Sequence, residues 1–178
     1  MHATGSKPNQ HNSHPLNVVL YQPEIPQNTG NIGRTCVALG AKLWIVRPTA
    51  FRLDAAQLKR AGLDYWQHLD WTAVDNWAQL LEQLPSGRLW LLTKFATRSY
   101  HRVTFQHGDA LVFGCETNGL PEKLRQEHSE QQLAIPMPGP VRSLNLATAA
   151  GIVMYTAATQ LGILDSIAAD PAPVMPKL

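Results

Sequence analysis

Five short apolar runs, over 16–21, 42–46, 88–92, 110–114 and 132–135, constrain the fold more than any other feature. They do not alternate apolar with polar residues, which is typical of parallel strands buried on both faces. Helical patterns separate them, over 28–39, 54–61, 73–84, 121–128 and 145–161. Gly40 and Gly62 stand at expected helix ends, and Pro121 at an expected first helical position. The alternation predicts one α/β domain with a parallel sheet flanked by helices.

Both ends of the 178-residue chain lack the apolar residues of a core. Residues 1–15 are rich in Asn, Gln, His, Ser and Pro, and residues 165–178 contain three prolines. We therefore expect a disordered tail over 1–15, a folded domain over 16–164 and a loose tail over 165–178. No apolar run reaches the roughly 20 residues of a membrane span, and no secretory signal is visible, so we expect a cytoplasmic protein.

Net charge and cysteine content say little about the partner of the protein, but they limit the kinds of binding site that it can have. The formal net charge of +2 permits a nucleic-acid partner without arguing for one. A phosphate-binding surface must then be local, or be formed by two subunits together. Cys36 and Cys115 show no ligand spacing, so we expect two buried, reduced thiols and no metal site.

Polar residues follow the first predicted strand, and ligands of such sheets bind beyond the carboxyl ends of strands. Asn28 is a good helix N-cap, and Asn31 and Arg34 recur at intervals of three along one side of the helix. Two amides and a guanidinium there can hold a phosphate or an oxyanion. The alternative is a cap plus one solvated arginine. Gly30 and Gly33 within this helix indicate that something approaches its backbone closely.

Two later segments also carry chemistry-bearing residues. In FGCETNGLP, Gly114 and Gly119 leave room for a ligand, and Glu116 can pair with a cation or act as a base, unless this is a plain Gly/Asn turn. In IPMPGPVRSLN, a stiff loop leads to Arg142 and Ser143 near the start of the final helix, where they can contact a ligand. The alternative is that this segment is only the cap of a core helix. Neither GxxxxGK[ST] nor GxGxxG is present, which argues against nucleotide hydrolysis and nicotinamide chemistry.

Four motifs occur in a specific order: PEIPQNTGNIGRTC, LKRAGLDYW, LVFGCETNGLP and IPMPGPVRSLNLATAAGIVMY. Over about residues 16–161 the chain resembles the SPOUT superfamily, and within it the methyltransferases of the tRNA wobble-position ribose 2′-hydroxyl. The resemblance implies a deep C-terminal trefoil knot, which is an exception among folds. It also implies a homodimer with each active site near the subunit interface, tRNA as substrate, and S-adenosylmethionine bent within the knot loops.

The resemblance assigns roles to particular positions. The cofactor positions are Leu92, Thr93, Gly114, Glu116, Gly119, Ile135, Met137, Ser143 and Leu144. The catalytic positions are Arg34, Asn31, Glu116, Ser143 and Asn145. Arg34 falls at the ribose hydroxyl, where a guanidinium gives up its proton reluctantly and is better suited to stabilise a developing alkoxide. Tyr155 falls where the family makes dimer contacts.

Phosphate contacts are expected from basic side chains. The candidates are Lys59, Arg60, Lys94, Arg98, Arg102 and Arg142. Tyr65 and Trp66 can stack on a base, or pack in the core or an interface.

The chain departs from the family after RSLNL, where Ala147 and Thr148 replace the usual Ser-Asn. Two alternatives stay open, and this departure favours only the second. One is a 2′-O-methyltransferase for another tRNA or rRNA position, and the other is a non-catalytic RNA-binding relative.

Overall fold

The fold is seen in a computed structural model that describes residues 14–51, 64–85 and 87–165. The predicted helix over 54–61, Gly62 and most of both predicted tails lie outside the described residues. The elements in chain order are β1 (Leu16–Tyr21), α1 (Pro26–Leu39), β2 (Lys42–Val46), η1 (Asp64–His68), β3 (Trp71–Val74), α3 (Trp77–Gln83), β4 (Leu89–Leu92), η2 (Tyr100–Arg102), β5 (Asp109–Phe113), α4 (Glu122–Glu127), η3 (Ser129–Gln131), β6 (Gln132–Leu133) and α5 (Leu146–Gln160).

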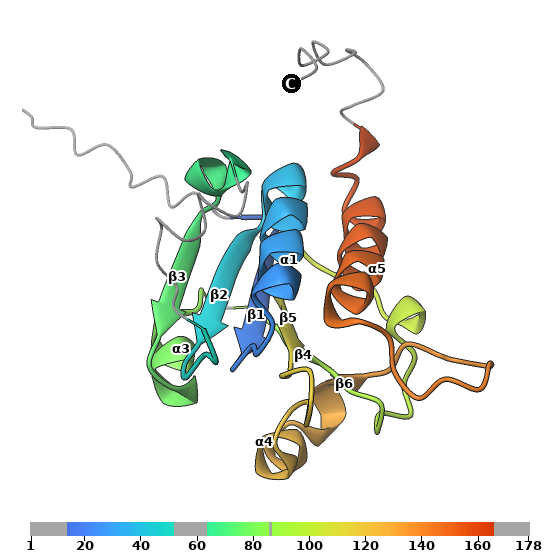
Figure 1. Ribbon diagram of the computed structural model, residues 1–178. Coiled ribbons are helices and arrows are strands. Elements are labelled where there is room, and N and C mark those ends of the chain that lie inside the picture. The colour runs from blue at the N-terminus through green and yellow to red at the C-terminus, as the bar shows by residue number, and fades with distance from the viewer. Residues whose placement is uncertain (1–13, 52–63, 86, 166–178) are drawn as a thin grey trace, which may run out of the picture.

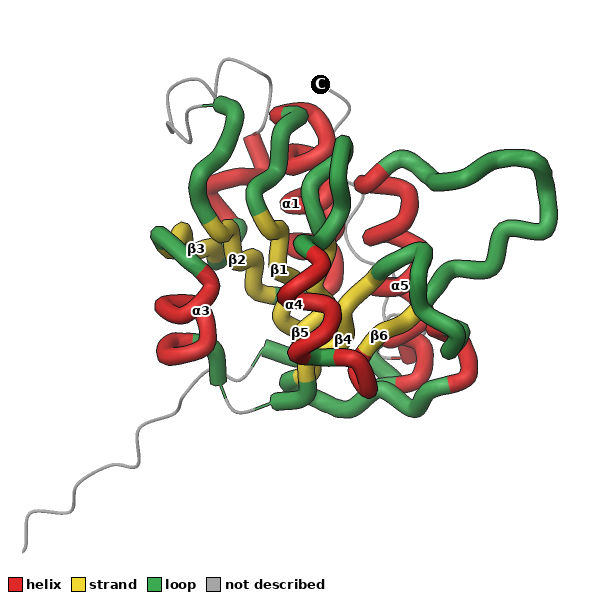
Figure 2. Tube along the Cα trace, turned by 90° about the horizontal axis from the view of Figure 1, so that it is seen from below, coloured by secondary structure: helices red, strands yellow, loops and turns green. Residues whose placement is uncertain are grey.

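A single six-stranded sheet in the order β3-β2-β1-β5-β4-β6 forms the middle layer, and all its strand pairs are parallel. Helices α1 and α5 cover one face, and α3 and α4 cover the other (Figures 1 and 2). In β1, Val18 and Leu20 belong to the core under α1 and α5, whereas Val19 belongs to the core under α3 and α4. Both faces of the strand are thus buried, which confirms the predicted parallel sheet flanked by helices.

One strand was not predicted, and one predicted helix begins too early. The helix expected over 73–84 is replaced by β3, which pairs with β2 through Leu43 and Trp71, and by the shorter α3. The physical reason is a local cap. The side chain of Asn76 accepts a 2.9 Å hydrogen bond from the backbone N–H of Gln79, which starts α3 after the strand has ended.

Helix boundaries also differ from expectation at two starts. Helix α1 begins at Pro26, with Ile25 as its N-cap, so the prediction that Asn28 caps this helix is wrong. Pro121 is the N-cap of α4 rather than its first residue. The predicted end at Gly40 is confirmed, because this glycine has a φ of 64° and its N–H donates to carbonyls of the last turn of α1.

The two cysteines are free thiols in different surroundings. Cys36 lies in the core under α1, and its burial raises the pKa of the thiol, whereas Cys115 is only half-buried, contrary to expectation. Among the helices that the structure describes, none is long and apolar enough to cross a membrane.

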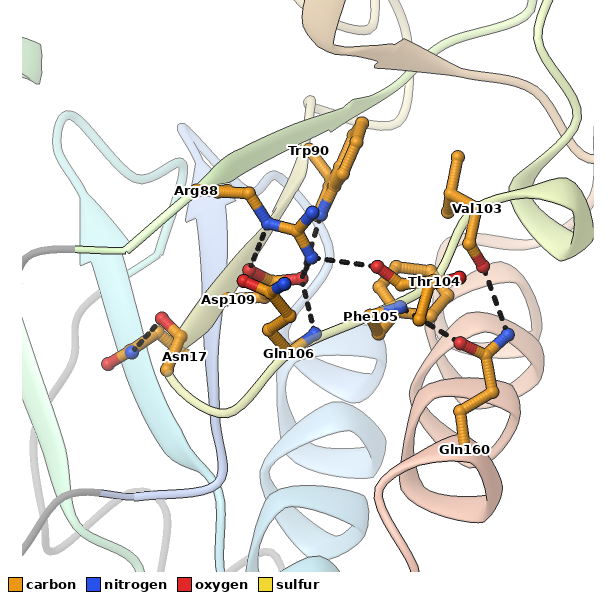
Figure 3. A network of polar contacts seen from close by, with 10 residues as sticks. Asn17, Arg88, Trp90, Val103, Thr104, Phe105, Gln106, Asp109 and Gln160 are labelled. Atoms are coloured by element: carbon orange, nitrogen blue, oxygen red, sulfur yellow. Dashed lines mark hydrogen bonds and ion pairs between the residues drawn. The ribbon is translucent and has the colours of Figure 1, made fainter.

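A buried carboxylate organises the edge of the sheet where β4 and β5 begin (Figure 3). Asp109, only 1% exposed, accepts two hydrogen bonds from the guanidinium of Arg88, at 2.8 and 3.1 Å. It also accepts from the indole N–H of Trp90 and the backbone N–H of Gln106, both at 2.9 Å. Four donors therefore compensate the desolvation of one charge.

The end of α5 is fastened near the same network (Figure 3). The amide of Gln160 accepts from the backbone N–H of Phe105 at 2.9 Å and donates to the carbonyl of Val103 at 3.1 Å. The final helix is thereby held to the chain that enters β5.

We predict that Asp109→Ala lowers the free energy of unfolding by about 3–5 kcal/mol, since Arg88 and Trp90 lose a buried partner. Urea denaturation measures this loss. Lys123→Ala is the control, because it breaks an exposed pair with Glu127 at 3.8 Å and should cost less than about 1 kcal/mol. Equal losses in the two variants would contradict the prediction.

Candidate functional site

The site lies where the chain leaves β1 for one face of the sheet and leaves β5 for the other. Helix α1 follows β1, and α4 follows β5 on the opposite face (Figure 2). The crevice outside the carboxyl ends of two such strands is the usual ligand site of an open parallel sheet. A cavity of about 440 Å³ opens here, within the range of roughly 300–1,000 Å³ typical of small-molecule sites.

The cavity is lined by the loops that follow β4, β5 and β6 and by residues at the starts of α1 and α5. Every position that the family resemblance assigns to the cofactor is in this lining. These residues are Leu92, Thr93, Gly114, Glu116, Gly119, Ile135, Met137, Ser143 and Leu144. The structure thus brings together residues up to 52 positions apart in the sequence, from Leu92 to Leu144.

Glu116 is bound to the chain that enters α1. One carboxylate oxygen accepts from the backbone N–H of Glu24 at 2.8 Å. The other accepts from the backbone N–H of Ile25 at 3.2 Å and from the side-chain amide of Asn28 at 2.9 Å. Glu116 therefore satisfies free N–H groups at the start of α1 and places a negative charge at the positive end of its dipole.

Asn28 continues this chain of hydrogen bonds to the final helix. Its side chain is 5% exposed and its amide oxygen accepts from the amide of Asn145 at 2.9 Å. The amide oxygen of Asn145 accepts in turn from the backbone N–H groups of Ala147 and Thr148, so Asn145 caps α5. The side chains of Glu116, Asn28 and Asn145 thus join the loop after β5 to the starts of α1 and α5.

Backbone geometry explains the two glycines of the loop after β5, Gly114 and Gly119, whereas the sequence suggested room for a ligand. A Cβ on Gly114 would collide with the backbone of Gly119 and Leu120, so the space beside it is filled by the chain itself. Gly119 has a φ of 68°, which favours glycine. Both residues line the cavity, and only the Cβ side of Gly114 is filled by the chain itself.

Asn31 and Arg34 are exposed on α1, and neither is among the described residues that line the cavity. The guanidinium carbon of Arg34 lies 4.6 Å from the centre of the Tyr65 ring. The hydroxyl of Tyr65 donates a 2.7 Å hydrogen bond to the carbonyl of Gly30. Tyr65 therefore orients Arg34 against α1 by a cation–π contact.

Packing against Trp66 explains why position 33 of α1 is a glycine. A Cβ on Gly33 would come within 2.8 Å of the Trp66 ring, and Trp66 is only 8% exposed. The close approach expected at this helix is made by η1, and Trp66 packs in the core rather than on a base.

Four of the candidate RNA contacts lie in the described part of the chain. Lys94 and Arg142 line the cavity, and Arg98 and Arg102 are exposed in the chain after β4. Lys59 and Arg60 lie outside the described residues. Within the described ranges, no three His, Cys, Asp or Glu side chains are grouped in a way that would hold a metal ion.

Two residues were not predicted in the roles that they have here. Asn28 links Glu116 to Asn145, and Tyr65 orients Arg34. The signal for Asn28 was Pro26, because a proline in the first turn moves the helix start upstream and places Asn28 inside it. No local signal pairs Tyr65 with Arg34, which is distant in sequence.

Comparison with known proteins agrees with this geometry. A tRNA (cytidine(34)-2′-O)-methyltransferase of Methylovorus glucosotrophus is 43% identical, covering 80% of this chain and 93% of its own. A solved structure described as giving structural insights into the 2-OH methylation of C/U34 on tRNA is 49% identical, with a TM-score of 0.77 and coverage of 83% and 97%. An AdoMet-bound rRNA methyltransferase from Sinorhizobium meliloti is 26% identical, with a TM-score of 0.72 and coverage of 83% and 59%.

The profile of the SpoU rRNA Methylase family matches residues 15–155, nearly all of the folded part of the chain. The expectation drawn from the four motifs is confirmed at this level, since the SpoU enzymes are the methyltransferases that the motifs resemble. The chain belongs to the SpoU rRNA Methylase family.

Proposed function

We propose that this protein transfers a methyl group from S-adenosylmethionine to the ribose 2′-hydroxyl of the wobble nucleotide of tRNA, a cytidine or a modified uridine. The observation that carries the proposal is the cavity, whose lining includes every cofactor position of the family. The substrate assignment is supported by relatives above 40% identity that are named for cytidine 34 of tRNA.

The cavity fits S-adenosylmethionine in size and in chemistry. Leu92, Ile135 and Leu144 provide apolar walls for the adenosine, and the backbone around Gly119 and Thr93 provides hydrogen-bonding groups. When bound, S-adenosylmethionine supplies a methyl group that its sulfonium charge has already activated. The chain itself must then orient the hydroxyl, which alone can contribute about 7–11 kcal/mol.

Arg34 stabilises the developing alkoxide, and Glu116 is not the general base. Both oxygens of Glu116 already accept hydrogen bonds from Glu24, Ile25 and Asn28, so this carboxylate holds the site together. A guanidinium is a poor proton acceptor but a strong paired donor toward an oxyanion. The proton then passes to water or to a phosphate oxygen of the RNA.

The proposal includes a homodimer, because Arg34 is outside the cavity of its own chain. A second hollow beside the cavity is lined by apolar residues of the loop before α5, among them Val141, and Val141 is 57% exposed. Tyr155, expected at the dimer contact, is 47% exposed on α5. Such apolar exposure suits a subunit interface.

The proposal also includes the trefoil knot near the C-terminus and a cytoplasmic location, where tRNA is available. In support of the knot, the chain after β4 runs beside the chain after β6, with Ser99 paired to Ala134. The chain then turns through the Pro-rich loop into α5.

The non-catalytic alternative rests on Ala147 and Thr148. Both lend only their backbone N–H groups to Asn145 in this structure, so the cap of α5 does not need the side chains that the family usually has there.

We expect S-adenosylmethionine at one hundred times its dissociation constant to stabilise the protein by about 2.7 kcal/mol, seen as a higher Tm. We also expect label from S-adenosylmethionine to appear on bulk tRNA, at the wobble ribose on mapping. Stabilisation with label at another nucleotide would favour the other-position alternative. No stabilisation and no label would favour the non-catalytic relative.

Glu116→Gln should lower the free energy of unfolding by about 1–3 kcal/mol, because an amide NH₂ would face N–H donors. We also expect weaker S-adenosylmethionine binding by calorimetry, since the cavity wall loses its support. Glu24→Gln is the control, because Glu24 accepts only exposed bonds from Thr117, at 2.9 and 2.7 Å. If Glu116→Gln lowered kcat alone, with Tm and cofactor affinity unchanged, Glu116 would instead be the base.

Arg34→Ala should lower kcat about 10²–10³-fold, as expected when one oxyanion donor is removed. Arg34→Lys should also lose most of its activity, because a lysine lacks the planar pair of donors. Cofactor affinity should be unchanged, since Arg34 does not line the cavity. Single-turnover methyl transfer to tRNA measures the rates. Arg47→Ala, which removes an exposed arginine paired with Asp75, is the control, and near-full activity of Arg34→Lys would contradict the role.

A further inference from the structure

An exposed aromatic ring stands at the edge of the cavity. Phe95 follows Thr93 and Lys94 in the loop after β4, and all three residues line the cavity. Its relative exposure of 59% is the highest among the exposed large hydrophobic residues of the described chain, above Val141 at 57%. Leaving most of a phenylalanine in water forgoes part of the roughly 1.5–3 kcal/mol that its burial would provide.

Two cations from different segments contact this ring. The guanidinium carbon of Arg125, on α4, lies 4.2 Å from the ring centre, and the ammonium of Lys94 lies 5.3 Å from it. Arg125 is held in place, because its Nε donates to the carbonyl of Leu120 at 3.2 Å. The cation–π contacts orient the ring and concentrate positive charge beside it.

We propose that Phe95, Lys94 and Arg125 form a platform on which a base of single-stranded RNA stacks, beside the nucleotide whose ribose enters the cavity. The inference rests on the proposed function, and it assigns the RNA contact to this site. Every nucleobase offers a face that stacks on an aromatic ring, and unpaired loops present such bases splayed out. The cations contact the phosphates on either side of the stacked base.

The same surroundings argue against a lid over the cofactor. The sulfonium of S-adenosylmethionine is positive, so two cations beside the ring disfavour closure of Phe95 over it. RNA is a polyanion, and it gains from those charges. The overall charge of +2 gives little attraction for RNA, so a local concentration of this kind is what binding requires.

The experiment measures the dissociation constants of bulk tRNA and of S-adenosylmethionine for the full chain and its variants. We expect Phe95→Ala to weaken tRNA binding about 5- to 150-fold, the range reported for loss of one stacked base. Phe95→Trp should retain binding, because it keeps the aromatic face. Arg125→Gln should make the plot of log affinity against log salt concentration less steep, by about the slope that one phosphate contact contributes. S-adenosylmethionine affinity should change much less than tRNA affinity in all three, because Phe95 lies at the edge of the cavity.

Leu81→Ala is the matched control, since Leu81 is a large hydrophobic residue, 44% exposed, on α3. Unchanged tRNA affinity in Phe95→Ala, with wild-type methyl transfer intact, would overturn the platform and leave the proposed function standing. Weaker cofactor binding with unchanged tRNA binding would identify Phe95 as a lid and also overturn it. A wild-type protein that binds tRNA through Phe95 but transfers no methyl would overturn the proposed function alone.

Discussion

The hydrogen bonds that run from Glu116 through Asn28 to Asn145 are the contacts on which the site depends. They join the loop after β5 to the first turns of α1 and α5. Glu116 accepts from a backbone N–H at the start of α1, and Asn145 accepts from one at the start of α5. Asn28 connects these two side chains. The cavity wall and the two helix starts are therefore one polar unit, in which the loss of one partner leaves a buried donor or acceptor unmatched.

The sheet order decides where such a unit can form. Because β1 and β5 are neighbours whose following segments cross to opposite faces, their carboxyl ends leave a crevice that no helix fills. At the opposite end of β5 lies Asp109, which is only 1% exposed. There the buried carboxylate is enclosed by Arg88, Trp90 and Gln106. Stability and ligand binding are thus assigned to opposite ends of the same strands.

Much of this arrangement could be predicted from the sequence, because strands buried on both faces read as continuous apolar runs. The edge strand β3 was missed because three of its four residues are only half-buried, and its last residues fit a helical pattern equally well. Asn28 was misplaced for a different reason. Pro26 is a local signal for the earlier helix start, but the partner Glu116 is 88 residues away, and a contact over that distance has no local signal. Motif order identified the cavity residues, whereas the contact between Tyr65 and Arg34 needed coordinates.

The position of Arg34 constrains how the reaction can be assembled. Asn28 fixes the start of α1 to the cavity wall, and Arg34 stands six residues further along the same helix, a rise of about 9 Å at 1.5 Å per residue. Tyr65 holds its guanidinium on the flank of α1. Within one chain, the guanidinium therefore stays on the flank of α1, outside the cavity lining. In the proposed homodimer, bound RNA would bring the ribose between the cavity of one subunit and an Arg34 guanidinium, which is why the proposed reaction needs more than one chain.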